Sequence, residues 1–285
     1  MLRQLFRSIG RRTPAAPSAP APRRAGDAHP ETARELRLDK AHAGVPIDLH
    51  RRIQFGGITV AGLDFLTLLE SCLRDTHTGI RPAKAFRRYQ AALHLARYFA
   101  HTIGVPGERA ECGVFTGAAS LLMCRLMRAR HPGFDGSGFH LVDSFEGIGA
   151  PGAADALELR TDERGETVGA FAYAKGAMAA PIEYARGAMR EFPAARIHKG
   201  WIPEVLEALP DAEFAFVHVD VDLYEPTRAC LEHFYPRLAR GGVMLCDDYG
   251  SRTFPGAGRA WDEFCDRHGV TFVALETAQS VILRE

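Results

Sequence analysis

Apolar side chains in the first third of the chain recur every three or four residues, the spacing of one face of an amphipathic helix. One such series begins just after Gly62 and comprises Leu63, Leu66, Leu69 and Leu73. Pro82 suits the first turn of a second helix, whose apolar series comprises Ala91, Leu95, Tyr98 and Phe99. The pattern predicts two helices that form an N-terminal helical cap within residues 46–105.

From Pro106 onward, short apolar runs alternate with helical segments. The runs predict seven strands, which begin near residues 109, 138, 195, 214, 243, 270 and 280. The segments between them predict helices over residues 118–130, 182–189, 225–238 and 261–268. Alternating strands and helices build a doubly wound, mostly parallel sheet. We therefore expect an α/β domain over residues 106–285, with the last two strands forming an antiparallel pair.

The fourth strand and the helix after it are expected to form the centre of this domain. Residues 214–220 are largely apolar, as in a parallel strand buried on both faces. Gly241 and Gly242 follow the helix predicted over residues 225–238. Because glycine readily adopts the left-handed conformation beyond a helix terminus, we expect these two glycines to close the helix and the next strand to begin after them.

Residues 1–45 differ in composition from the rest of the chain. Six arginines and no acid occur before residue 25, and the stretch is interrupted by Pro14, Pro17, Pro20 and Pro22. Such a segment cannot bury enough apolar surface to offset the entropy lost on ordering, so we expect a disordered tail. As an alternative, a membrane-surface or targeting helix would have an apolar face made of Leu2, Leu5, Phe6 and Ile9. The long apolar segment of a secretory signal does not follow.

Composition excludes several classes of protein. The 285 residues include 35 Lys and Arg and 35 Asp and Glu, so the formal net charge is zero. This balance argues against a broadly basic nucleic-acid-binding surface. No apolar run approaches the roughly 20 residues of a transmembrane helix. The six cysteines form no CxxC pair, so we expect reduced, buried thiols in a cytoplasmic protein.

The ends of the first two strands of the domain carry candidate cofactor-binding residues. The first strand ends in ECGVFTG, where Gly113 and Gly117 let a ligand approach the backbone and a helix N-terminus. Asp143 ends the second strand, placed to accept hydrogen bonds from ribose hydroxyls, and Ser144 follows it. The GxGxxG and GxxxxGK(S/T) phosphate-binding motifs are absent from the sequence, and Glu111 suits a ligand's ammonium group. S-adenosylmethionine therefore fits this loop better than NAD or ATP.

Four carboxylates follow the fourth and fifth strands. Asp220 and Asp222 occur in HVDVDLY, and Asp247 and Asp248 occur in LCDDYG. If the two strands are neighbours, their ends lie about 5 Å apart and the four carboxylates repel one another. A hard divalent cation removes this repulsion, and oxygen ligands favour Mg²⁺, Mn²⁺ or Ca²⁺ over zinc. As an alternative, Asp222 caps the following helix. We interpret His218 as a core residue.

These motifs, in this order and spacing, resemble those of the macrocin O-methyltransferase family. The resemblance extends from about Glu108 to Glu285 and rests on ECGVFTG, DSFEG, FVHVDVDLYEPTRACLEHFYPRLARGGVMLCDDYG and a helix ending in WDEF. Members are bacterial, metal-dependent enzymes that use S-adenosylmethionine to methylate sugar hydroxyls of macrolides and aminocoumarins. The resemblance implies a Rossmann-like class I methyltransferase fold, a seven-stranded, mostly parallel sheet with its last strand antiparallel.

The resemblance also implies roles for individual residues. Asp222 is the candidate general base, and the metal ligands are Asp220, Asp247 and Asp248. The methionine end of the cofactor is bordered by Glu111, Gly113 and Gly117. Its ribose is bound by Asp143, next to Ser144. The sequence departs from the family pattern at 115–118, where Phe-Thr-Gly-Ala replaces an aromatic-Arg-Gly-Gly run, and at 207–210, where Glu-Ala-Leu-Pro replaces acid-Thr-Leu-Pro.

The sequence thus predicts an S-adenosylmethionine- and Mg²⁺- or Mn²⁺-dependent O-methyltransferase that acts on a hydroxyl of a sugar or glycosylated natural product. Its partner is a small-molecule acceptor rather than nucleic acid, and a homo-oligomer is compatible with the sequence. One alternative is a metal-dependent glycosyltransferase, in which Asp220 and Asp222 form an Asp-x-Asp motif for a nucleotide sugar. Another is a non-catalytic nucleoside-binding scaffold.

Overall fold

The computed structural model describes residues 54–79, 85–157 and 173–285. The predicted tail over residues 1–45 and the predicted helix start at Pro82 lie outside these ranges. The chain divides into two units, Met1–Pro46 and Ile47–Glu285, of which only the second contains described residues.

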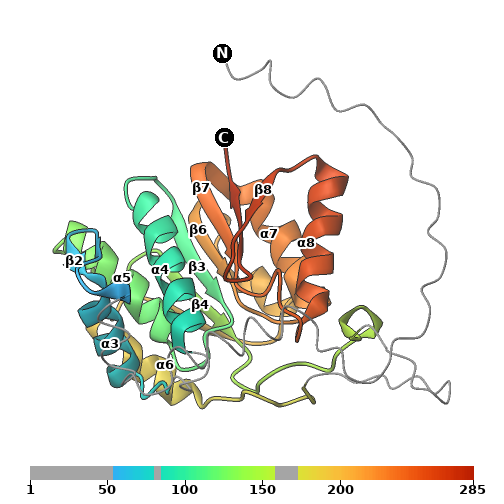
Figure 1. Ribbon diagram of the computed structural model, residues 1–285, viewed down its shortest axis with the longest axis horizontal. Coiled ribbons are helices and arrows are strands. Elements are labelled where there is room, and N and C mark those ends of the chain that lie inside the picture. Colours follow the sequence, from blue (N-terminus) through green and yellow to red (C-terminus); the bar gives the residue numbers. More distant parts are fainter. Residues whose placement is uncertain (1–53, 80–84, 158–172) are drawn as a thin grey trace, which may run out of the picture. The chain divides into compact units, whose positions relative to one another are not determined.

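A seven-stranded sheet forms the centre of the second unit and confirms the predicted fold class (Figure 1). Its strands are β3 (Glu108–Cys112), β4 (Phe139–Asp143), β5 (Arg196–Lys199), β6 (Phe214–Val219), β7 (Leu238–Cys246), β8 (Phe272–Ala274) and β9 (Ser280–Leu283). They are arranged in the order β5-β4-β3-β6-β7-β9-β8. The last strand, β9, is antiparallel to both of its neighbours, whereas β3 to β7 are parallel.

Helices cover both faces of this sheet, as Figure 1 shows. One face carries α3 (Phe65–Asp75), α4 (Ala85–His101), α5 (Ala118–Arg130) and α6 (Ile182–Ala188). The other carries α7 (Tyr224–Phe234) and α8 (Pro255–His268). Single 3-10 turns occupy Ala153–Asp155, Met189–Glu191, Glu204–Ala208 and Tyr235–Arg237. A small antiparallel pair, β1 (Thr59–Val60) and β2 (Leu63–Asp64), precedes α3, so Leu63 belongs to a strand rather than to the predicted helix.

Side chains of the central strands point to the two faces of the sheet and contribute to two separate apolar clusters. All of β6 is buried, as predicted for a central parallel strand. Phe216 joins the cluster beneath α3, α4 and α5, whereas Val217 and Val219 join the cluster beneath α7 and α8. The intervening His218 is 2% exposed and lies within the sheet rather than at its surface. Because β6 is covered on both faces, its polar residues become accessible only beyond Val219.

The predicted role of Gly241 and Gly242 after the helix that follows β6 is wrong, as is the predicted start of the next strand. The helix ends at Phe234, and β7 begins at Leu238, which pairs with Phe214. Gly241 and Gly242 therefore lie inside the strand, at an irregularity of its pairing with β6. A Cβ at Gly242 would lie 2.7 Å from the Ala239 carbonyl oxygen, so this close approach of backbones requires glycine. The two glycines therefore lie at an irregularity in β7 and do not end a helix.

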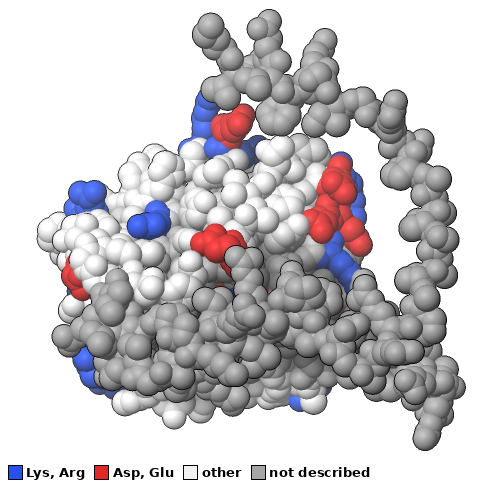
Figure 2. Space-filling model, viewed as in Figure 1, with Lys and Arg blue, Asp and Glu red and all other residues white. Residues whose placement is uncertain are grey.

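Charges on the face drawn in Figure 2 are dispersed in small groups among uncharged side chains. Among the helices in the described ranges, none combines the length and the apolar character that crossing a membrane requires.

Candidate active site at the strand ends

The carboxyl ends of β3, β6 and β7 lie side by side, as the prediction of neighbouring acidic motifs requires. The Asp220 N–H donates to the Cys112 carbonyl at 2.8 Å, and the Asp247 N–H donates to the Val219 carbonyl at 2.9 Å. Gly113 has a φ of +88°, and a Cβ there would lie 1.8 Å from the Asp220 carbonyl oxygen. Glycine is thus required where the candidate cofactor loop passes the first acidic motif.

Three carboxylates converge at this edge of the sheet. Each of Asp220, Asp222 and Asp248 offers an oxygen that lies within 4.8 Å of the oxygens of the other two. Asp248 is 9% exposed, and its buried Oδ2 has no hydrogen-bond partner among the described residues. Asp222 has a φ of +63°, a backbone conformation that residues other than glycine rarely adopt. We refer to these three residues as the carboxylate trio.

Burial and mutual repulsion disfavour the ionised forms of the trio. Burial and the neighbouring charges of Asp247 and Asp248 raise the pKa of Asp220 well above its ordinary value. Burial and Asp220 raise the pKa of Asp222 in the same direction, as burial and Asp222 do for the pKa of Asp248. Arg88 on α4 acts to lower the pKa of Asp220 and Asp222. Positive charge placed among the three carboxylates would favour their ionised forms.

Asp247 differs from the trio in what it contacts. Its Oδ1 accepts a hydrogen bond from Gln279 Nε2 at 2.8 Å and lies 3.9 Å from His218 Nε2. The second distance is too long for a hydrogen bond, so the attraction is between charges. Burial is the largest single influence and acts to raise the pKa of Asp247. His218, Gln279 and Arg88 together outweigh it, so the pKa is lowered. Asp247 is therefore the carboxylate of the four that its surroundings keep ionised.

His218 lies between the acidic motifs and the candidate cofactor loop, although its sequence context favours a core role. Its Nδ1 is 3.1 Å from Glu111 Oε1, and Ser120 Oγ donates to Glu111 Oε2. Burial alone would lower the pKa of His218, yet Asp247 and Glu111 raise it well above its ordinary value. Glu111 is 1% exposed, so its two oxygens serve these internal contacts. The sequence of β6 alone does not predict these contacts of His218, because Glu111, Ser120 and Asp247 come from three other parts of the chain.

The predicted ribose-binding carboxylate organises the loop between β3 and α5. Asp143 Oδ2 accepts from the N–H groups of Val114 at 2.6 Å and Phe115 at 2.9 Å, and its Oδ1 accepts from Phe145 N–H at 2.6 Å. Ser144 Oγ donates to the Gly147 carbonyl at 3.1 Å. These bonds fix the backbone on both sides of the loop end. They occupy both lone pairs of Oδ2, whereas Oδ1 retains a second lone pair.

Gly117 forms the N-cap of α5 with a φ of +89°. A Cβ there would lie 2.9 Å from the Cβ of Ala188, the last residue of α6, so the residue has both conformational and steric reasons to be glycine. The loop that contains Gly113 and Gly117 therefore leads directly to the N-terminus of α5, whose backbone N–H groups are available to a ligand.

Asp155, which sequence analysis overlooked, supports the segment that follows Asp222. Its Oδ1 accepts from Tyr224 N–H at 2.7 Å and its Oδ2 accepts from Gly152 N–H at 2.8 Å. The first bond satisfies the N-terminus of α7, whose N-cap residue, Leu223, has no side-chain capping bond. The alternative in which Asp222 caps this helix is therefore wrong, because Asp155 fills that place from a distant segment.

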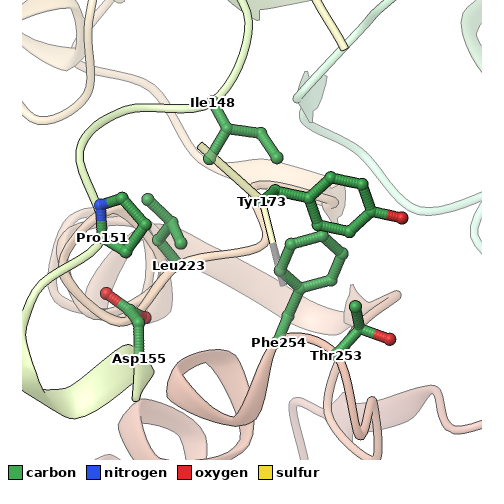
Figure 3. Close-up of a pocket in the computed structure, with 7 residues that line it drawn as sticks. All are labelled: Ile148, Pro151, Asp155, Tyr173, Leu223, Thr253 and Phe254. Carbon is green, nitrogen blue, oxygen red and sulfur yellow. The ribbon is translucent and has the colours of Figure 1, made fainter. Parts of the chain in front are cut away.

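An apolar pocket adjoins the end of β6 (Figure 3). It is lined by Ile148, Pro151, Asp155, Tyr173, Leu223, Thr253 and Phe254. The rings of Tyr173 and Phe254 are stacked, with centroids 5.1 Å apart and planes 15° apart, and Leu223 faces them across the pocket. Since Leu223 directly follows Asp222, the pocket offers apolar surface next to the carboxylates.

Comparison with known proteins identifies the family. A model described as macrocin-O-methyltransferase (TylF) matches residues 87–278, about two thirds of the chain, including the cofactor loop and both acidic motifs. The chain belongs to the macrocin-O-methyltransferase family. The resemblance noted in the sequence is thereby confirmed.

Curated relatives in this family are named as O-methyltransferases of glycosylated compounds. The chain is 33% identical over 153 residues to 8-demethyl-8-(2,3-dimethoxy-alpha-L-rhamnosyl)-tetracenomycin-C 4'-O-methyltransferase of Streptomyces olivaceus, covering 51% of this chain and 54% of that protein. It is 32% identical over 152 residues to demethyldecarbamoylnovobiocin O-methyltransferase of Streptomyces niveus, covering 51% and 53%. The chain therefore spans about half the length of the curated relatives it matches.

Solved structures agree with the fold. The O-methyltransferase NovP has a TM-score of 0.55 and 26% identity over 69% of this chain and 80% of that chain. The calicheamicin methyltransferase CalS11 has a TM-score of 0.57 and 20% identity over 94% of this chain and 99% of that chain. Both support the class I methyltransferase fold.

The residues at this edge suit a hard divalent cation. Their donors are carboxylate oxygens, which Mg²⁺ and Mn²⁺ prefer. The unpartnered Asp248 Oδ2 is a buried acceptor that a ligand to it would satisfy. The trio contains the predicted ligands Asp220 and Asp248 together with the predicted base Asp222, whereas Asp247 lies on the side of His218 and Gln279.

Proposed function

We propose that the chain transfers a methyl group from S-adenosylmethionine to a hydroxyl of a sugar in a glycosylated natural product, with Mg²⁺ or Mn²⁺ at the carboxylates. The observation that carries this proposal is the convergence of the trio beside a loop suited to a nucleoside. Family membership and the names of the relatives support the reaction class and the kind of acceptor. The same membership argues against the glycosyltransferase alternative.

Asp220 and Asp248 would hold the cation, with Asp247 as the third protein ligand. Asp220 and Asp248 already lie together, and contact with His218 keeps Asp247 ionised and ready to coordinate. When bound, the cation supplies positive charge that makes a neighbouring acceptor hydroxyl easier to deprotonate. Because Asp222 lies in the trio, a second arrangement has Asp222 as the third ligand in place of Asp247. The two arrangements predict different effects of an Asp222 substitution on metal affinity.

Asp222 would take the proton of the acceptor hydroxyl. Burial raises its pKa, so its ionised form is a stronger base than an exposed aspartate. Asp155 already satisfies the N-terminus of α7, which leaves the Asp222 carboxylate free of a structural task there. The φ of +63° at Asp222 is a strained conformation of the kind that persists where function requires a particular side-chain direction.

The loop between β3 and α5 would bind the cofactor. Gly113 and Gly117 would border the methionine end of the cofactor and allow close approach to the backbone. Glu111 lies beneath the loop, where its two oxygens contact His218 and Ser120, so it would support this end of the site without contacting the ammonium group. Asp143 holds the loop amides and would use the remaining lone pair of Oδ1 for a ribose hydroxyl, with Ser144 beside it. Fixing the methyl donor and the acceptor oxygen side by side supplies much of the rate acceleration, on the order of 7 kcal/mol.

The proposal is tested with Asp220→Asn. We expect the wild-type protein, given isotopically labelled S-adenosylmethionine, Mg²⁺ and a panel of glycosylated polyketides, to yield a product that gains one labelled methyl group by mass spectrometry. Asp220→Asn should lose at least 100-fold in turnover, because one ligand of the cation is gone, while its Kd for S-adenosylhomocysteine changes little. The exposed Asp211→Asn is the matched control and should behave as wild type.

Two outcomes contradict the proposal. One is wild-type methyl transfer that persists in excess chelator or in Asp220→Asn. The other is tight binding of S-adenosylhomocysteine without methyl transfer to any acceptor of the panel, which favours the non-catalytic scaffold.

A further inference from the structure

The turn between β8 and β9 inserts two buried polar side chains beneath the acidic motif that follows β7. Gln279 is 1% exposed and Thr277 is 2% exposed. The Gln279 Nε2 group donates to Asp247 Oδ1 at 2.8 Å and to the Ala91 carbonyl at 3.2 Å. Its Oε1 accepts from Thr277 Oγ1 at 2.7 Å. Both ends of the amide are thus occupied, and one of its donors is committed to a candidate metal ligand.

The same turn is held by α4. Arg87 Nε donates to the Thr277 carbonyl at 3.0 Å, and His94 Nδ1 lies 3.3 Å from Thr277 Oγ1. At the exposed rim, Gln90 Nε2 donates to Glu276 Oε1 at 3.4 Å. The turn therefore cannot shift without breaking bonds to a helix that lies 183 to 190 positions earlier in the chain.

A carboxylate that binds a cation must present a fixed oxygen, and this requires that its rotation be restricted. In the Asp247 side chain, the Gln279 amide fixes Oδ1, and His218 lies 3.9 Å from the same oxygen. The amide of Gln279 is neutral and keeps its donor at every pH between 4 and 10, roughly. It therefore restricts Asp247 without depending on any protonation equilibrium.

We propose that Gln279 is a positioning residue of the metal site, which holds Asp247 in the orientation needed to coordinate the cation and links that orientation to α4 through Thr277 and Ala91. This inference rests on the proposed function, because it requires Asp247 to be a ligand. Hydrogen-bond partners of metal ligands typically change metal affinity about 10- to 100-fold when removed. Gln279 is separated from Asp247 by 32 positions and belongs to no acidic motif, so it adds a determinant of metal binding outside them.

The test uses two substitutions, because a buried change can disturb folding. Gln279→Met keeps the approximate volume and removes every hydrogen bond of the amide. Gln279→Glu keeps the acceptor for Thr277 and replaces the donor with a second carboxylate against Asp247. Gln90→Ala is the matched control, since Gln90 contacts the same turn only at its exposed rim.

We would measure Mn²⁺ affinity of the S-adenosylhomocysteine-loaded full chain by electron paramagnetic resonance, together with the Kd for S-adenosylhomocysteine. We expect Mn²⁺ affinity to fall about 10- to 100-fold in Gln279→Met and further in Gln279→Glu, with less than about a threefold change in nucleoside Kd. In Gln279→Met, kcat should recover at saturating Mn²⁺. Gln90→Ala should match the wild type.

Unchanged Mn²⁺ affinity in both Gln279 variants would overturn the inference. Parallel losses of Mn²⁺ and nucleoside affinity in both variants would also overturn it, because they would indicate a role in folding alone. Failure of the wild type to bind Mn²⁺ is a different result: it removes the metal from the proposed function, and the inference with it.

Discussion

Single residues at the strand ends have tasks that their sequence positions only partly disclose. Asp222 follows the end of β6 and precedes α7, a place where an aspartate usually caps a helix. In the structure Asp155 supplies that bond from 69 positions away, and Asp222 turns with a positive φ toward Asp220 and Asp248. A capping role could be excluded only once the distant segment was placed.

At this scale, Asp222→Asn distinguishes a base from a metal ligand. If Asp222 is the base, turnover should fall about 10²- to 10⁴-fold and Mn²⁺ affinity should stay near the wild-type value. Asp247→Asn should instead weaken Mn²⁺ binding. Calorimetric titration of both variants with Mn²⁺, beside initial rates, separates the roles. A large loss of Mn²⁺ affinity in Asp222→Asn would show that Asp222, and not Asp247, is the third ligand.

At the scale of elements, strands were predictable where burial on both faces leaves a continuous apolar run. The seven predicted strands are all present, and β6 matches to within one residue. The error lies at the start of β7, where Gly241 and Gly242 suggested a helix end. Glycine is required both beyond helices and at strand irregularities, and the pairing partner that decides between them, β6, cannot be identified from local sequence.

The parallel strands β3, β4 and β5 carry a polar cluster that predicts a dependence of stability on pH. His140 Nδ1 lies 2.9 Å from His198 Nε2, and His140 Nε2 contacts Glu108. Burial, with help from His140 and Arg196, lowers the pKa of His198 below its ordinary value. The unfolded chain therefore binds a proton at His198 more readily than the folded protein does, so this residue reduces stability as pH falls through about 6.5.

We expect the free energy of unfolding to decrease more between pH 7.5 and pH 5.5 in the wild type than in His198→Gln, which cannot take up the proton. Urea unfolding at the two pH values measures both changes. Comparing the variant with the wild type removes the contribution of other titrating groups. An equal decrease in the two proteins would contradict the assignment.

At the scale of the whole molecule, the site is assembled from segments that are far apart in the sequence. The acidic motifs could be recognised because each directly follows a predicted strand. Gln279, Asp155 and the carbonyl of Ala91 could not, because their roles depend on how a hairpin, a loop and a helix pack around those strands. The family match covers residues 87–278, so it includes α4 from Arg87 but begins after α3.

The predicted division of the chain leads to an expectation for a shortened protein. Ile47–Glu285, the second of the two units into which the chain divides, contains every residue of the candidate site. Removing residues 1–45 should leave the thermal midpoint and the Kd for S-adenosylhomocysteine unchanged within error. Differential scanning calorimetry and isothermal titration provide the check. A drop of several degrees in the midpoint would mean that the tail contributes to folding of the domain.

The central claim is that carboxylates from the ends of β6 and β7 share one divalent cation beside the cofactor. A crystal structure of the protein with S-adenosylhomocysteine and Mn²⁺, recorded with anomalous scattering, tests it most directly. We expect a single strong Mn²⁺ peak within coordination distance of Asp220 and Asp248, with the nucleoside on the loop between β3 and α5. A peak elsewhere, or a bound nucleoside with no peak at these aspartates, would contradict it.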